Sequence, residues 1–236
     1  TDEEAPQYAQ ALQDQMAQVQ AVLHGLGYPG QHLTWLQADR VDSLDAQLKT
    51  LPAAPARPGP PAKFALTSDK RSSLALALDH WMSHAPAAQA WPEAIALPTA
   101  GAFWGGVQVD AQACTLCLSC VSACPASALQ DNPDQPELAI IEKNCVQCGL
   151  CVTTCPENAI QTVPRLLLTP ARHERQVLNQ SQPYSCVRCS KPFGTLKAIE
   201  AMLGKLSGHA MFQGAAAERL KMCSDCRVID MMEKAK

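Results

Sequence analysis

The feature that most constrains this chain is a cysteine pattern that occurs twice. Four cysteines with the spacing C-x2-C-x2-C-x3-C are followed by a proline, and the same arrangement recurs 31 positions later. The first copy contains Cys114, Cys117, Cys120 and Cys124, and the second contains Cys145, Cys148, Cys151 and Cys155. A repeat with a fixed period indicates two copies of one structural unit. We therefore expect each copy to form a short strand, a cysteine-rich loop, a helical turn that begins at the proline, and a second short strand.

The spacing of these cysteines is typical of iron–sulfur chemistry. Three thiolates spaced two residues apart can surround one face of a cubane cluster, because a short loop turns successive sulfur atoms inward. The fourth cysteine of each copy is expected to begin a helix, to point away from its own loop and to bind the cluster of the other copy. The predicted ligands of one [4Fe–4S] cluster are Cys114, Cys117, Cys120 and Cys155. The predicted ligands of the other are Cys145, Cys148, Cys151 and Cys124.

Structural zinc and disulfides are the alternative interpretations of these eight cysteines. Two matching copies of the full pattern favour clusters over both alternatives. With crossed ligands, neither half can close its site without the other, so the fold and the cluster content should be lost together.

Residues 107–163, which carry the duplicated motif, resemble a bacterial-type ferredoxin with two [4Fe–4S] clusters (8Fe–8S). The resemblance implies an α+β, ferredoxin-like domain with pseudo-twofold symmetry and one-electron transfer between two neighbouring clusters. The flanking residues resemble the C-terminal part of larger multi-domain bacterial iron–sulfur proteins of the kind associated with formate dehydrogenase systems. That resemblance implies redox protein partners, one donor and one acceptor, which it does not identify.

A second group of cysteines lies near the C-terminus, where Cys186-x2-Cys189 and Cys223-x2-Cys226 form two CxxC pairs. Two such pairs can supply four thiolates at the corners of a tetrahedron, which suits one structural Zn²⁺. A rubredoxin-like iron site with four cysteine ligands, a third cluster and a redox dithiol pair are the alternatives, and ligand softness alone does not separate zinc from iron. The segment between the pairs, 195–222, has a helical apolar pattern that breaks near Ser207. His209 is a spare candidate ligand in the same segment.

The region before the duplicated motif is predicted to be a small α/β domain, incomplete at its N-terminus. Helices are expected over 1–24, over 41–51 and after Ser68 or Asp69, and Asp42 or Ser43 should cap the second of them. Short strands are expected at 32–36, 64–66 and 94–97, and a proline-rich linker at 51–63. The predicted domains are 1–98 (α/β), 99–169 (two-cluster ferredoxin) and 170–236 (helical module stapled by a four-cysteine metal site).

Composition excludes several classes of function. The chain of 236 residues has a net charge of −3 and lacks a long apolar run, which argues against generic nucleic-acid binding and against a membrane span. The first ten residues, TDEEAPQYAQ, lack the order of a secretory signal, and we expect a reducing cytoplasmic location.

Other motifs are weaker. Gly25-Leu26-Gly27-Tyr28-Pro29-Gly30 matches G-x-G-x-x-G by letter, but it ends a predicted helix, so helix capping is favoured over dinucleotide binding. His80 and His84 are spaced by four residues and are interpreted as an exposed helical face. No catalytic residues are predicted.

The leading hypothesis is therefore an electron-transfer module without an active site of its own. The alternatives are an iron–sulfur assembly or regulatory protein, and an electron-transfer fragment of a larger reductase.

Overall fold

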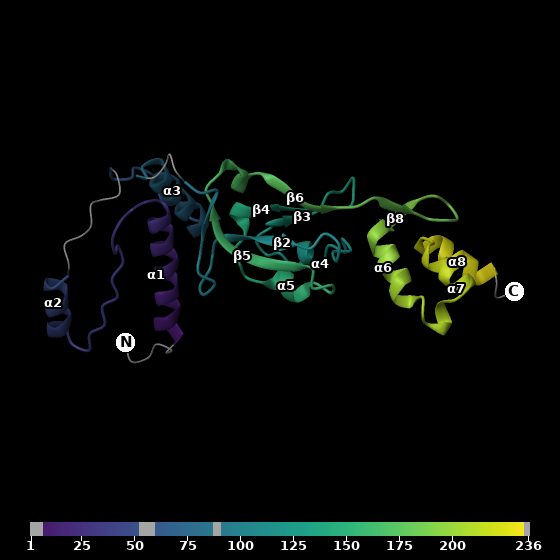
Figure 1. The fold of residues 1–236 in the computed structure, drawn as a ribbon, viewed down its shortest axis with the longest axis horizontal. Coiled ribbons are helices and arrows are strands. Elements are labelled where there is room, and N and C mark those ends of the chain that lie inside the picture. Colours follow the sequence, from purple (N-terminus) through teal and green to yellow (C-terminus); the bar gives the residue numbers. More distant parts are fainter. Residues whose placement is uncertain (1–6, 52–59, 87–90, 234–236) are drawn as a thin grey trace. The chain divides into compact units, whose positions relative to one another are not determined.

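The computed structural model describes residues 7–51, 60–86 and 91–233. It divides into two compact units, Thr1–Trp104 with Pro164–Thr169, and Gly105–Val163 with Pro170–Lys236. Figure 1 labels their helices and strands in chain order. Most of the predicted proline-rich linker lies outside the described residues, as do the first six residues of the chain. Among the described residues, no helix is both long and apolar enough to span a membrane.

The first unit is built mainly from helices. It contains α1 (Gln7–Gly25), α2 (Val41–Lys49), α3 (Lys70–Ser83) and the short strand β1 (Ala94–Ala96). Its core is apolar and is formed by residues of α1 and α3 and of the segments around β1, including Val22, Leu26, Leu78 and Ile95. The strand β1 pairs antiparallel with the last residues of β5 (Ile160–Leu167), with Ala94 opposite Leu167.

The ends of the helices show why they begin and stop where they do. Asp69 caps α3 by accepting hydrogen bonds from the N–H groups of Arg71 and Ser72 at 3.2 and 2.7 Å. After α1 ends at Gly25, Gly27 adopts a φ of +87° and donates to the carbonyl of His24, so the glycines serve as the predicted helix cap. The segment does not open a helix, as a dinucleotide fingerprint would.

Three predictions for this unit are wrong. Neither 32–36 nor 64–66 forms a strand, so the described part of 1–98 contains β1 alone and is not an alternating α/β domain. The N-cap of α2 is Arg40, without a side-chain hydrogen bond, rather than Asp42 or Ser43. The backbone N–H of His32 is bound by the side chain of Gln20 on α1 at 2.9 Å, which replaces a strand partner.

The second unit begins with two small sheets around the duplicated motif. β2 (Gly105–Val109) is hydrogen-bonded to β5, and β4 (Glu137–Ile141) lies between β3 (Leu129–Gln130) and β6 (Arg175–Gln180). Both pairs in the second sheet are antiparallel, with Leu129 opposite Ile140 and Ile140 opposite Gln176. The molecule thus combines helices with small antiparallel sheets, as an α+β class predicts.

The helical turns of the motif lie before the prolines and not after them. α4 (Ser119–Ser122) precedes Cys124, and α5 (Leu150–Thr154) precedes Cys155, so the prediction that the fourth cysteine begins a helix is wrong. Leu118 and Gly149, the N-caps of these turns, adopt φ values of +60° and +74°. The left-handed backbone of Leu118 and of Gly149 sets the direction in which α4 and α5 begin. The proline after each helix starts a tight turn that leads to the next strand.

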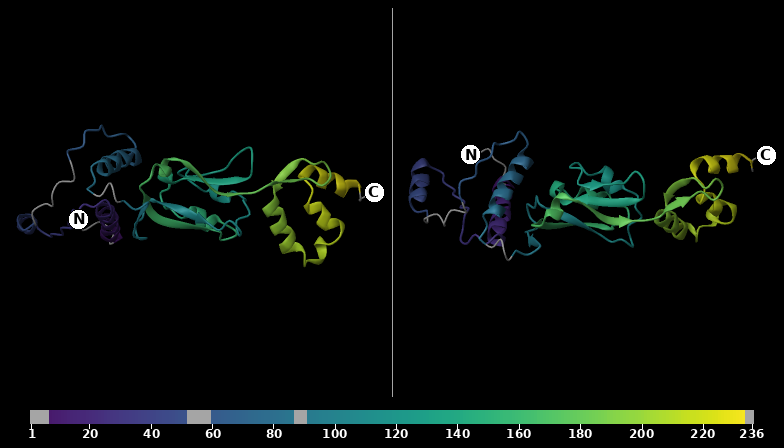
Figure 2. Two further views of the ribbon diagram at one scale, coloured as in Figure 1. Left: turned by 45° about the horizontal axis from the view of Figure 1, so that its top comes forward. Right: turned by 90° about the horizontal axis from the view of Figure 1, so that it is seen from above.

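The C-terminal part of the second unit is a hairpin with helices. β7 (Pro183–Ser185) and β8 (Pro192–Thr195) pair antiparallel, and α6 (Leu196–Leu206), α7 (Ala215–Leu220) and α8 (Ser224–Glu233) follow. Figure 2 shows this hairpin and the three helices, coloured green to yellow, gathered together. The helix breaks after Leu206, as the sequence predicts, and short 3-10 segments lie at Glu142–Asn144, Pro170–His173 and Ala210–Phe212.

Candidate metal centres

The cysteine loops repeat the same backbone conformation in both copies. Leu116 and Gln147 occupy matching positions between the first and second cysteines, with φ values of +58° and +55°. Ser127 and Asn158, which follow the motif prolines at matching positions, have φ values of +49° and +50°. Such angles are unusual for residues other than glycine, and their recurrence in pairs shows that both loops take one shape that turns cysteine side chains inward.

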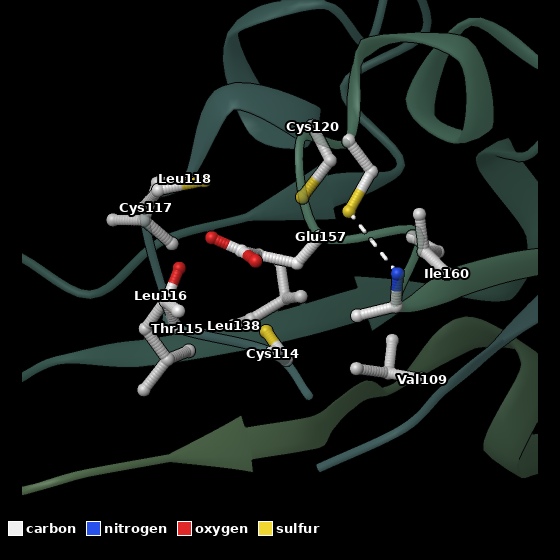
Figure 3. Close-up of a pocket in the computed structure, with 12 residues that line it drawn as sticks. Val109, Cys114, Thr115, Leu116, Cys117, Leu118, Cys120, Leu138, Glu157 and Ile160 are labelled. Carbon is white, nitrogen blue, oxygen red and sulfur yellow. Dashed lines mark hydrogen bonds between the residues drawn. The ribbon is translucent and has the colours of Figure 1, made fainter. Parts of the chain in front are cut away.

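The first pocket lies among Cys114, Cys117, Cys120 and Cys155, so three thiols come from the first copy and one from the second. Apolar side chains form most of the remaining wall. They include Val109, Leu116, Leu138 and Ile160. Figure 3 shows Cys114, Cys117 and Cys120 with these residues, and Glu157 extends its carboxylate among them.

The second pocket has the reciprocal composition. It is lined by Cys145, Cys148 and Cys151 from the second copy and by Cys124 from the first. Its apolar wall includes Val107, Leu129, Ile140 and Ala126, the last at the position that corresponds to Glu157 in the first pocket. The structure therefore groups the eight cysteines into the two sets of four that the sequence predicts.

The fourth cysteine of each copy is held by a local hydrogen bond. The N–H of Ala128 donates to Sγ of Cys124 at 3.3 Å, and the N–H of Ala159 donates to Sγ of Cys155 at 3.3 Å. The second of these bonds is the dashed line in Figure 3. The matching bonds show that both copies hold their fourth cysteine in the same way.

Burial opposes thiolate formation in these pockets. Burial, with a contribution from the neighbouring Cys114 and Cys117, raises the pKa of Cys120 to about 11. Burial also raises the pKa values of Cys145 and Cys151. A bound cation reverses this preference because it stabilises the thiolates directly. Several thiols in an apolar cavity, with no disulfide among the cysteines, fit a cationic metal cluster.

One lining side chain of the second pocket contacts a sulfur atom. The amide of Gln147 donates to Sγ of Cys145 at 3.2 Å and to the carbonyl oxygen of Gly106 at 2.8 Å. Its counterpart in the first pocket is Leu116, a buried apolar residue. Sequence analysis did not select Gln147, although alignment of the two copies pairs it with a leucine and so marks the difference.

The C-terminal helices contact the rim of the first pocket. The hydroxyl of Thr195, the N-cap of α6, donates to the carbonyl of Thr115 at 2.9 Å. The ammonium of Lys205 binds the two carboxylate oxygens of Glu157 at 2.8 and 2.7 Å. These contacts fix α6 beside the loop between Cys114 and Cys117, and the sequence offered no pattern that would reveal them.

The four C-terminal cysteines form a separate cluster. The Sγ atoms of Cys186, Cys189, Cys223 and Cys226 all lie within 4.8 Å of one another. The first pair lies at the β7–β8 hairpin and the second at the start of α8. Tetrahedral bonds of about 2.3 Å place sulfur atoms about 3.8 Å apart, and the Sγ atoms of Cys189 and Cys223 are 3.8 Å apart. The donor set and its spacing therefore fit one tetrahedral metal ion.

Electrostatics at this cluster differ between thiols. Burial disfavours ionisation of Cys186, but N–H donors of Cys223, Cys189 and Arg188 outweigh it and lower its pKa to about 6. Burial and the neighbouring thiols raise the pKa of Cys226 to about 12. The backbone thus favours at least one thiolate before a metal adds its own charge.

The histidine candidates do not join these sites. The four thiols of the C-terminal cluster have no histidine among them within the described residues. His209 instead accepts a hydrogen bond from the N–H of Met211. His80 and His84 stack with ring centroids 4.4 Å apart, and each binds a backbone carbonyl. The interpretation of His80 and His84 as helix-surface residues agrees with these contacts.

Comparison with known proteins places the duplicated motif in a family. No curated protein sequence matches the chain. Residues 113–160, however, match the family model of the 4Fe-4S dicluster domain, and the match covers all eight cysteines of the two pockets. This segment is a 4Fe–4S dicluster domain of the iron–sulfur class.

Proposed function

We propose that the chain transfers single electrons through two [4Fe–4S] clusters, one in each pocket, between a redox enzyme and an acceptor protein. The observation that carries the proposal is the pair of pockets, each walled by four thiols and apolar side chains, within a segment that matches a dicluster domain. A bound [4Fe–4S] cluster supplies reversible one-electron chemistry. The chain contributes the ligands, excludes water with its apolar walls and holds the two pockets within one core.

The proposed ligands follow the crossed arrangement. Cys114, Cys117, Cys120 and Cys155 would hold the first cluster, and Cys145, Cys148, Cys151 and Cys124 the second. The support is that every pocket draws its fourth thiol from the other copy. Leu138 of the first pocket and Val107 and Ile140 of the second belong to one core cluster, so each site rests on both halves of the domain.

The C-terminal Cys186, Cys189, Cys223 and Cys226 would hold one structural Zn²⁺. Three of these thiols are buried and all four are close enough for tetrahedral ligation, which is typical of closed structural sites.

The donor and acceptor are proposed to be redox proteins, with a formate dehydrogenase-type enzyme as the candidate donor on the basis of sequence resemblance. Twelve cysteines that are grouped for metal binding suit a reducing compartment, and we propose the cytoplasm.

Metal content and spectroscopy of anaerobically purified protein test the proposal. We expect about eight Fe and about one Zn per chain from these ligand sets. Dithionite should reduce the clusters reversibly, and electron paramagnetic resonance (EPR) should detect two interacting spins. Transfer of intact clusters to an apo-protein, without reversible reduction, would instead indicate an assembly role.

Paired cysteine variants test the crossing itself. Cys124→Ala with Cys148→Ala removes two ligands of one proposed site, so about four Fe should remain. Cys124→Ala with Cys117→Ala removes a ligand from each proposed site, so almost no Fe should remain. If each copy instead bound its own cluster, the two results would be exchanged.

A further inference from the structure

We propose that Gln147 raises the reduction potential of the cluster in the second pocket by donating a hydrogen bond to the ligand sulfur of Cys145. The inference depends on the proposed function, because it assumes a cluster in each pocket. It concerns a residue that is not a ligand and that acts through the sulfur of Cys145.

The hydrogen bond from Gln147 is fixed by its surroundings. The amide nitrogen lies between two acceptors, the sulfur of Cys145 and the carbonyl oxygen of Gly106. If the amide were turned over, its oxygen would face both acceptors, so the donor orientation is the one that satisfies them. The amide oxygen is buried without a hydrogen-bond partner among the described residues. The sulfur contact is therefore maintained at the cost of an unsatisfied oxygen.

The backbone leaves a specific space for this amide. A Cβ atom on Gly105 would lie 2.5 Å from the amide nitrogen of Gln147 and 2.4 Å from the carbonyl oxygen of Val163. Only glycine avoids both clashes. The left-handed φ of Gln147, +55°, directs the side chain back toward β2 and Gly106. The absence of a side chain at Gly105, the carbonyl oxygen of Gly106 and the backbone angle of Gln147 thus together position the Gln147 amide.

A hydrogen bond to a ligand sulfur has a definite electronic effect. Reduction adds negative charge to the cluster and its thiolates, so a donor at the sulfur stabilises the reduced state more than the oxidised state and raises the potential. Leu116 cannot donate at the matching position of the first pocket. The first pocket has a different side-chain contact, between Oγ of Ser119 and Sγ of Cys117 at 3.5 Å, so the two sites differ in which ligand sulfur a side chain contacts.

Charges also differ between the two pockets. Glu157 lines that pocket and its negative charge disfavours reduction there, whereas Ala126 takes its place in the second pocket. Lys205 offsets this carboxylate through its ion pair. Lys197 is bound at the carbonyl of Ala111, outside the wall of the pocket, and faces the carboxylate of Asp110.

Redox titration of the holoprotein, followed by EPR, tests the inference with Gln147→Met. Methionine keeps the length of the side chain and removes the donor. The potential of the second cluster should fall, so that the ratio of reduced to oxidised cluster at a fixed potential drops about tenfold, or about 59 mV for one electron. Iron content should stay at about eight per chain. Leu116→Met is the matched control, and it should leave both potentials in place.

Each other outcome is decisive. A fall in the potential of the first cluster alone, no change in either potential, or an equal shift in the Leu116→Met control would overturn the role of Gln147 and leave the two-cluster function standing. Failure of the unaltered protein to bind clusters would overturn the proposed function itself. Adding Gln147→Met to Cys117→Ala or to Cys148→Ala shows which cluster responds. The shift should persist with Cys117→Ala, which keeps all four proposed ligands of the second cluster, and should be absent with Cys148→Ala.

Discussion

At the scale of single residues, Gly105 should be the least replaceable glycine of the dicluster domain. A Cβ there would meet backbone as well as the Gln147 amide, so Gly105→Ala should lower the free energy of unfolding by about 1–3 kcal/mol. Gly204→Ala, in α6, is the control: a Cβ there has no atom within 4 Å among its surroundings, and alanine should stabilise the helix by about 0.5–1 kcal/mol. Thermal unfolding of the holoprotein measures both effects, and equal changes in the two variants would contradict the steric argument.

Individual residues also show what a sequence reveals. The spacing of the eight motif cysteines predicted how they group into pockets, because short loops allow few directions for a side chain. Gln147 carries no such constraint in its own sequence position. Its importance comes from Gly105 and Gly106 on β2, which lie about forty positions earlier in the chain. The sequence alone therefore predicted the grouping of the thiols better than the groups that surround them, and their role as ligands stays a prediction.

At the scale of elements, the cap of α3 gives a direct test of the first unit. Asp69→Ala removes the acceptor for the N–H groups of Arg71 and Ser72, so the first unit should unfold at a lower temperature. Asp69→Asn keeps an acceptor oxygen and should behave like the unaltered protein. Circular dichroism during heating distinguishes the two variants, and a normal melting curve for Asp69→Ala would show that packing of Leu78 holds the helix without its cap.

The sequence predicted helix α3 better than the strands at 32–36 and 64–66, for a physical reason. Helix α3 combines a local cap with an apolar pattern, so its start could be read from neighbouring residues alone. Strands need a partner, and neither 32–36 nor 64–66 has one: Leu66 remains 81% exposed, and the backbone at His32 is bound by a side chain of α1. The turn before each motif proline depends on left-handed residues, one of which is a leucine, and that choice is not visible in local propensity.

At the scale of the whole molecule, the predicted three domains and the two compact units divide the chain differently. Residues 164–169 complete the first unit through β1, and the C-terminal helices share a unit with the dicluster domain. Thr195 and Lys205 contact the rim of the first pocket, so α6 covers a surface near a proposed cluster. The assignment of three domains stays a prediction.

The C-terminal metal site should be separable from the clusters. Cys189 is the exposed member of the four thiols, so Cys189→Ala removes a ligand with little loss of packing. The small core there consists of the three buried cysteines with Phe193 and Met222, and without a metal it is too small to hold the hairpin against α8. We expect loss of about one Zn, rapid proteolysis within 183–233, and retention of about eight Fe by a protease-resistant dicluster domain.

Val187→Ala, an exposed change in the same loop, is the control and should retain both the zinc and the resistance of 183–233 to proteolysis. Loss of iron together with zinc in Cys189→Ala would show instead that α6 and its contacts with Thr115 and Glu157 are needed to keep the first pocket closed.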